Sequence, residues 1–118
     1  MASNYLVALQ QIAVEMLEQT GIDQQQAEQI LQPLMTQSLK NTQENGPINA
    51  LTGPVARGDV RTLEFHLDAI SAKDPKHLAL YKELGKVAVE LARGQGKLDE
   101  VRLRAITALF SDTKPSKQ

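Results

Sequence analysis

Apolar residues recur at helical spacing along most of this chain, and that period constrains the fold more than any other feature. In the first twenty residues the apolar positions three or four apart are Leu6, Leu9, Ala13, Met16 and Leu17. This spacing puts side chains on one face of an α-helix, and no segment alternates as a half-buried strand does. Aromatic residues make up only 3% of the chain, so its core has to be aliphatic, which suits helix packing. The sequence predicts an all-α fold, a compact bundle of about six helices over residues 1–112.

Capping residues and a proline set the expected helix boundaries in the first half of the chain. We expect Ser3 to cap a first helix that ends near Gly21. Asp23 and Gln26 have the spacing of a capping box, in which each side chain bonds the other residue's backbone N–H. Pro33 would cost about 3 kcal/mol inside a helix, so we expect one helix to end just before it and another to begin there.

Turn residues divide the second half in the same way. Asn45-Gly46-Pro47 is a predicted turn, and Asp59 is expected to cap the helix that follows the next loop. Pro75 fits the first position of a further helix. Gly85 lies inside that helix, where glycine costs roughly 1 kcal/mol relative to alanine, and a close helix approach would compensate. Gly96 is expected to end it.

The last predicted helix spans residues 98–110 and carries apolar residues on two faces. Such a helix is expected to be covered on both sides or to pack on a partner chain. Residues 113–118 are expected to be a disordered tail.

Residues 51–58 form a loop rich in glycine and proline, which we call the signature loop. After it, Asp59, Thr62 and His66 fall at i, i+3 and i+7 and therefore share one helix face, with Arg57 just upstream. Arg57 and the free N–H groups at the helix start would hold an anion, Thr62 would donate a hydrogen bond, and His66 would transfer a proton. An ordinary capped helix with a packed histidine and a surface arginine also fits, and the pattern alone favours this interpretation.

A longer stretch around the signature loop resembles a known helical domain. Residues 50–59, Ala-Leu-Thr-Gly-Pro-Val-Ala-Arg-Gly-Asp, are followed by Thr62 and His66-Leu67. This segment resembles the C-terminal domain, of unknown function, of two-domain proteins with a Rossmann-like first domain. Those proteins are similar in plan to pyrroline-5-carboxylate reductase, ketopantoate reductase and the 6-phosphogluconate dehydrogenase group. Further matches are residues 2–9, Tyr81, Leu84 and Leu91-Ala92.

The resemblance implies a fold like the C-terminal domain of 6-phosphogluconate dehydrogenase. It implies a substrate-binding and dimerisation half of an NAD(P)-dependent oxidoreductase that is not active alone. A homodimer and a small-molecule substrate, anionic if Arg57 binds it, are expected. No cofactor is expected on this chain alone, since NAD(P) would be held by an N-terminal Rossmann domain that the sequence lacks. The expected residues are His66 and Asn4 for catalysis, and Ser3, Thr52, Gly53, Arg57, Gly58, Asp59 and Thr62 for substrate binding.

Composition argues against several other classes. The net charge is −1, and no basic stretch is interleaved with aromatic residues, so nucleic acid is not an expected partner. The chain has no cysteine, and His66 and His77 lack a supporting ligand pattern, so no metal site is expected. No apolar run approaches the roughly 20 residues of a membrane span, and no basic residue precedes an apolar leader. We therefore expect a cytoplasmic protein without membrane contact.

Two alternatives remain open at this point. The chain could be a free-standing helical module that binds another protein, which the two-faced last helix favours. A small self-contained enzyme fits less well, because no activated nucleophile, metal set or paired carboxylates are visible.

Overall fold

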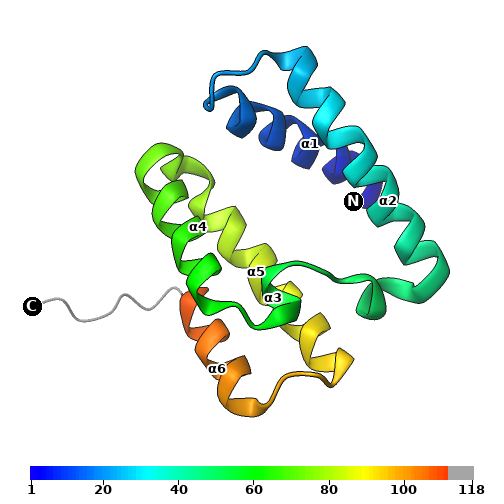
Figure 1. The fold of residues 1–118 in the computed structure, drawn as a ribbon, viewed down its shortest axis with the longest axis vertical. Helices are drawn as coiled ribbons and strands as arrows, with labels where there is room; N and C mark the ends of the chain where they lie inside the picture. The colour runs from blue at the N-terminus through cyan, green and yellow to red at the C-terminus, as the bar shows by residue number, and fades with distance from the viewer. Residues whose placement is uncertain (112–118) are drawn as a thin grey trace, which may run out of the picture. The chain divides into compact units, whose positions relative to one another are not determined.

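The structure, a computed structural model, describes residues 1–111, and most of that range is helical (Figure 1). No strand occurs among these residues, so the predicted all-α class is confirmed. The helices are α1 (Ala2–Glu18), α2 (Gln24–Ala50), α3 (Pro54–Arg57), α4 (Val60–Lys73), α5 (Leu78–Gln95) and α6 (Glu100–Leu109), with a 3-10 turn, η1 (Pro75–His77), before α5. The tail predicted at residues 113–118 lies outside the described residues.

Contacts divide the chain into two units, Met1–Glu44 and Asn45–Gln118. In the first unit, α1 and the adjoining part of α2 run alongside each other in opposite directions (Figure 1). Only Val14 and Ala27 are buried there. This helical hairpin therefore has almost no core of its own, and much of its apolar surface is exposed.

The start of α1 differs from the prediction, whereas the start of α2 agrees with it. Ser3 lies inside α1, which begins at Ala2 without any side-chain cap, so the predicted Ser3 cap is wrong. The capping box is confirmed. The backbone N–H of Gln26 donates to the carboxylate of Asp23 at 2.8 Å, and the Gln26 side-chain oxygen accepts from the Asp23 N–H at 3.1 Å.

The predicted break at Pro33 is also wrong, because α2 continues through this proline. Its only non-helical residue is Gly46, with φ 78° and ψ 162°, inside the predicted turn at residues 45–47. Pro33 is exposed, so water can reach the carbonyl of Gln29 that loses its helical donor. A continuous helix also keeps Met35 in the groove with Leu6 of α1. The exposed surface lets α2 accommodate the proline, and the helical backbone angles are interrupted only at Gly46.

The second unit is built around α5, against which α3, α4 and α6 pack (Figure 1). Its core is aliphatic apart from one aromatic ring, as the composition required. The buried apolar residues are Val55, Leu63, Val89, Ala92, Leu103, Ile106 and Phe110. Gly96 ends α5 in the left-handed conformation with φ 72°, which confirms the predicted cap.

The close approach predicted at Gly85 is confirmed. A Cβ atom at this position would lie 2.6 Å from ring atoms of Phe110, closer than van der Waals contact permits. The Phe110 ring, only 1% exposed, therefore lies directly on the backbone of α5. Glycine is required here because of packing, since the backbone angles at this position are helical.

The link between α4 and α5 is anchored by a buried acid. Asp74 is 5% exposed, and its carboxylate lies 2.8 Å from Nδ1 of His77. Pro75 opens η1 instead of a full α-helix, and α5 begins at Leu78.

The two apolar faces of α6 have different surroundings. Leu103 and Ile106 are buried against the rest of the second unit. Val101, on the other face, is 76% exposed. Of the two predicted faces, one is covered within this chain. The other is open at Val101 but partly covered at Leu98 and Leu109, which pack against the core.

Candidate functional site

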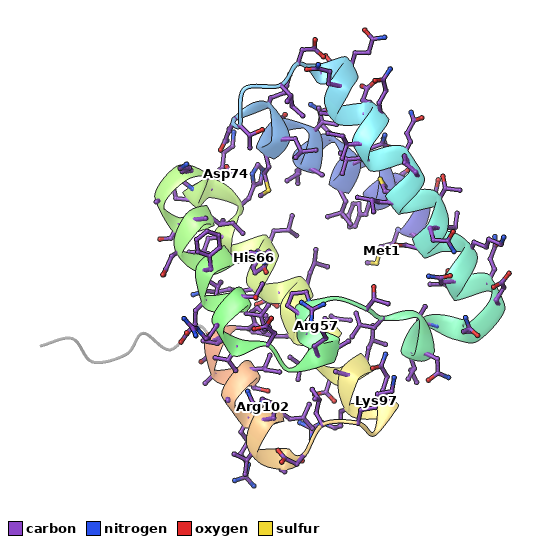
Figure 2. The ribbon with its side chains drawn as sticks, viewed as in Figure 1. Met1, Arg57, His66, Asp74, Lys97 and Arg102 are labelled. Atoms are coloured by element: carbon purple, nitrogen blue, oxygen red, sulfur yellow. The ribbon has the colours of Figure 1, made fainter. Side chains whose placement is uncertain are left out.

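The signature loop owes its shape to two glycines. Gly53 has φ 89° and precedes the single turn of α3, and Gly58 ends that turn with φ 68°. L-residues with a side chain rarely adopt such angles. The loop therefore turns sharply at both ends, and α3 presents Arg57 at its last position (Figure 2).

Two distant side chains hold the loop in place. The Gln95 amide of α5 donates to the carbonyls of Ile48 at 2.8 Å and Leu51 at 3.0 Å. From α6, the Arg102 guanidinium donates to the carbonyl of Gly58 at 3.2 Å. A Cβ at Gly58 would lie 2.8 Å from Cγ of Arg102, so this glycine also makes room for the arginine. The loop is thus fixed at both ends by the core helices.

Asp59 caps α4 as the sequence predicts, and its carboxylate gathers three donors. It accepts from the Thr62 hydroxyl at 2.7 Å and the Thr62 N–H at 3.2 Å, and Arg57 Nη2 lies 3.6 Å away. The Thr62 hydroxyl is the main cause of a lowered Asp59 pKa, followed by the Thr62 backbone and Arg57. Because the Thr62 N–H donates to Asp59, this amide is already occupied at the helix start, where the sequence suggested an anion.

His66 pairs with Tyr81, away from the Asp59 network. Nδ1 of His66 lies 3.2 Å from the Tyr81 hydroxyl, and the rings meet edge to face at 6.4 Å. Tyr81 in turn packs edge to face on Phe110 at 6.1 Å. Burial raises the pKa of Tyr81, because the phenolate is poorly solvated there. When Nδ1 carries no proton, the phenol O–H donates to it and Nε2 holds the imidazole proton.

The His66–Tyr81 pair lines an apolar cleft of about 400 Å³. The wall combines the signature loop with α4, α5 and the end of α6. Its other lining residues are Leu51, Thr52, Pro54, Val55, Leu63, Leu84, Gly85, Ala88 and Phe110. A reacting group here would meet two titratable side chains in largely apolar surroundings.

A second cleft, of about 600 Å³, also borders the signature loop. Leu51 and Thr52 line both clefts. Here the polar groups come from Arg57, Gln95 and Lys97, the last just beyond the end of α5 (Figure 2). We call this the basic cleft.

The structure groups some of the predicted residues and separates others. Thr52 and His66 share the apolar cleft, and Thr52, Gly53 and Arg57 share the basic cleft. Gly58, Asp59 and Thr62 line neither of them; they shape the loop and cap α4. Ser3 and Asn4 are exposed on α1, in the first unit.

Four side chains that line these clefts or anchor the loop beside them have no role in the sequence prediction: Tyr81, Gln95, Lys97 and Arg102. Tyr81 lies fifteen positions from His66, and only the family resemblance mentions both residues. Gln95 and Arg102 contact backbone groups 44 or more positions away, so no local pattern reveals them. The one available signal for Lys97 is the Gly-x-Gly-Lys segment after a helix. This segment lacks the spacing of a phosphate loop and no strand precedes it, so the sequence predicts a helix end and hinge there.

The described residues contain no helix long and apolar enough to cross a membrane. Within the same range, no three His, Cys, Asp or Glu side chains lie together as a metal site would require.

Comparison with protein families gives one match. Residues 1–88 of the 118 match the family described as "Domain of unknown function (DUF2520)", and the chain therefore belongs to that family. Curated proteins gave no match, and neither did solved structures.

Proposed function

We propose that this member of the DUF2520 family is the helical substrate-binding and dimerisation half of an NAD(P)-dependent oxidoreductase. In this proposal a separate domain holds the nicotinamide cofactor, which supplies a hydride when bound. The resemblance of residues 50–59 to two-domain reductases is one source of the idea. The observation that carries it is the His66–Tyr81 pair in an apolar cleft beside that same loop.

The proposed chemistry is the reduction of a C=O or C=N bond. The carbon receives the hydride, and the oxygen or nitrogen needs a proton. His66 in its imidazolium form would supply that proton from Nε2 and become neutral imidazole, while its Nδ1–H donates to the Tyr81 hydroxyl oxygen and fixes the ring. The apolar wall would exclude water and strengthen each polar contact.

The remaining predicted residues have supporting roles in this proposal. Thr52 would hydrogen-bond the substrate, since it lines the cleft that contains His66. Arg57 would hold an anionic group, while Asp59 and Thr62 position Arg57 and the start of α4. The roles expected for Ser3 and Asn4, both exposed on α1 in the first unit, rest on the resemblance alone.

The exposed surface of the first unit supports the dimerisation part of the proposal. Tyr5 is 61% exposed, Val7 65% and Leu34 61%. An apolar groove of about 320 Å³ is lined by Leu6, Leu34, Met35, Ser38, Leu39 and Thr42. Large exposed apolar patches mark interaction surfaces. Val7→Glu with Leu34→Glu should convert a dimer to a monomer in sedimentation, and Val87→Glu, an exposed apolar site of α5, should not.

The first experiment is the mass of the native protein in its source cells, detected with an antibody raised against this chain. A polypeptide of more than twice 13.0 kDa would support a two-domain reductase. A polypeptide of 13.0 kDa would contradict the reductase proposal. The exposed Val101 face of α6 then favours the second candidate function, a helical module that binds another protein.

The catalytic test uses the longer protein with NADPH or NADH and a panel of 2-oxo acids and cyclic imines. His66→Asn should lower kcat by about 10²–10⁴-fold, because asparagine cannot transfer a proton at neutral pH. His77→Asn is the matched control, since His77 pairs with Asp74 and lines neither cleft. Equal kcat values for the wild type and His66→Asn would exclude His66 as the proton donor.

A further inference from the structure

The basic cleft adds to Arg57 and Thr52 a second cation, Lys97, that the reductase proposal does not use. We propose that it binds a phosphate monoester, with Arg57, Lys97 and Thr52 around the phosphate and the apolar wall around the organic group. As a substrate site it deepens the proposed function and rests on it. As a binding site it stands on the cleft alone.

The charge of the basic cleft favours an anionic ligand. Its lining contains two cations, Arg57 and Lys97, and no carboxylate. Within residues 1–111, Lys97 makes no ion pair, so its ammonium is available to a ligand. Arg57 has one acidic neighbour, Asp59, at 3.6 Å, beyond direct hydrogen-bond distance. The guanidinium thus keeps free N–H groups for a second anion.

The cleft is also preorganised. Gln95 holds the start of the signature loop at Leu51 and the segment just before it at Ile48, and Arg102 holds the end of the loop at Gly58. Lys97 follows Gly96, whose left-handed conformation turns the chain out of α5 beside the loop. Binding would therefore order side chains more than backbone, which lowers its entropic cost.

Size and polarity select the class of ligand. A phosphate monoester carries about −1.5 to −2 charges at neutral pH, which matches two cations better than a single carboxylate does. A guanidinium can bind two of its oxygens at once, and Thr52 adds a hydroxyl donor. The cleft of about 600 Å³ has room for more than a bare ion, and Leu51, Ala56 and Leu98 supply apolar wall. An organic phosphate fits these features better than inorganic phosphate.

Calorimetric titration of the 118-residue chain tests the inference with three probes: phenyl phosphate, benzoate and inorganic phosphate. Phenyl phosphate and benzoate share the organic group and differ in the anion. Phenyl phosphate and inorganic phosphate share the anion and differ in the organic group. We expect phenyl phosphate to bind one site and to bind more tightly than either of the other probes. Benzoate binding as tightly as phenyl phosphate would overturn the phosphate assignment.

Charge-neutralising variants locate the site. Arg57→Gln and Lys97→Gln should each weaken phenyl phosphate binding by about tenfold, since one charge-assisted hydrogen bond contributes about 1.5–3 kcal/mol and 1.4 kcal/mol is tenfold. Arg104→Gln and Lys40→Gln are the controls, because both side chains are exposed and line neither cleft. Unchanged affinity in the Arg57→Gln Lys97→Gln double variant would place the phosphate elsewhere and overturn the inference.

The two proposals fail separately. Full activity of His66→Asn would remove His66 from the reaction and leave phosphate binding unaffected. Loss of specific phosphate binding would overturn the assignment of the basic cleft as a phosphate site. It would not affect the outcome of the His66→Asn experiment.

Discussion

The Phe110 ring lies against the backbone of Gly85, so close that a Cβ there would be 2.6 Å from the ring. Gly85→Ala must displace a fully buried ring, and we expect it to lower the free energy of unfolding by about 1–3 kcal/mol in urea titration. The gain of about 1 kcal/mol in helix propensity would offset only part of this.

Gly94→Ala, on the same helix, is the matched control. Its Cβ would meet Ile48, whose exposed side chain can move aside. This substitution should be neutral or stabilising. Equal stability of the two variants would show that Phe110 moves freely and that Gly85 is not a packing requirement.

Substitutions at Gly58 and Gly96 distinguish the cost of backbone strain from the cost of a side-chain clash. The two glycines have similar left-handed φ angles, 68° and 72°, but only Gly58 has crowded surroundings. Gly96→Ala should cost roughly 1–2 kcal/mol from the left-handed conformation alone. Gly58→Ala should cost about 1–3 kcal/mol more, since its Cβ would meet Arg102, whereas nothing lies within 4 Å at Gly96. Thermal unfolding measures both. Adding Arg102→Ala should relieve part of the Gly58→Ala loss, and no relief would argue against the contact.

Gln95 is expected to hold the signature loop more than to stabilise the fold. Gln95→Ala removes two hydrogen bonds and should cost about 1–2 kcal/mol. Amide hydrogen exchange in residues 51–58 should rise well above that in α4. Gln29→Ala, on exposed α2 surface, is the control. Uniform exchange across both segments would mean that Gln95 does not organise the loop.

Tyr81 should ionise only at a pH above the ordinary tyrosine value of 10.0, because burial raises its pKa. The folded state favours the neutral phenol, so this contribution to stability is complete below pH 10.0 and is lost as pH rises through the folded pKa. The chain has two tyrosines and no tryptophan, so Tyr5→Phe leaves Tyr81 as the sole phenol. Near-ultraviolet absorbance titration then compares native and urea-unfolded chains. Coincident midpoints would contradict the burial of Tyr81.

Asp59 should contribute acid-dependent stability. Its folded pKa lies below 3.8, so the contribution is present above that pH and is lost as pH falls through the folded pKa. Thr62→Val removes the main cause, the hydroxyl donor, and should move the Asp59 pKa upward in carboxyl NMR titration. Arg57→Gln should move it less, because Arg57 is a smaller cause. The reverse order would make the Arg57 charge the dominant partner.

The sequence by itself determined the local elements of this protein. The all-α class, the capping box of Asp23, the cap of Asp59, the interruption at Gly46 and the helix end at Gly96 were all predicted from residues a few positions apart. These features depend on backbone angles and short-range hydrogen bonds, which nearby residue types specify. The same local reasoning failed at Pro33, an exposed position where α2 accommodates the proline without a break.

The tertiary structure alone decided which side chains meet. The pairing of His66 with Tyr81 and the anchoring of the loop by Gln95 and Arg102 join residues from 15 to 47 positions apart. No periodicity encodes such contacts, because they follow from how α3, α4, α5 and α6 pack around one core. That packing places Thr52 between an apolar cleft and a basic one, and it brings Lys97 to the same cleft as Arg57.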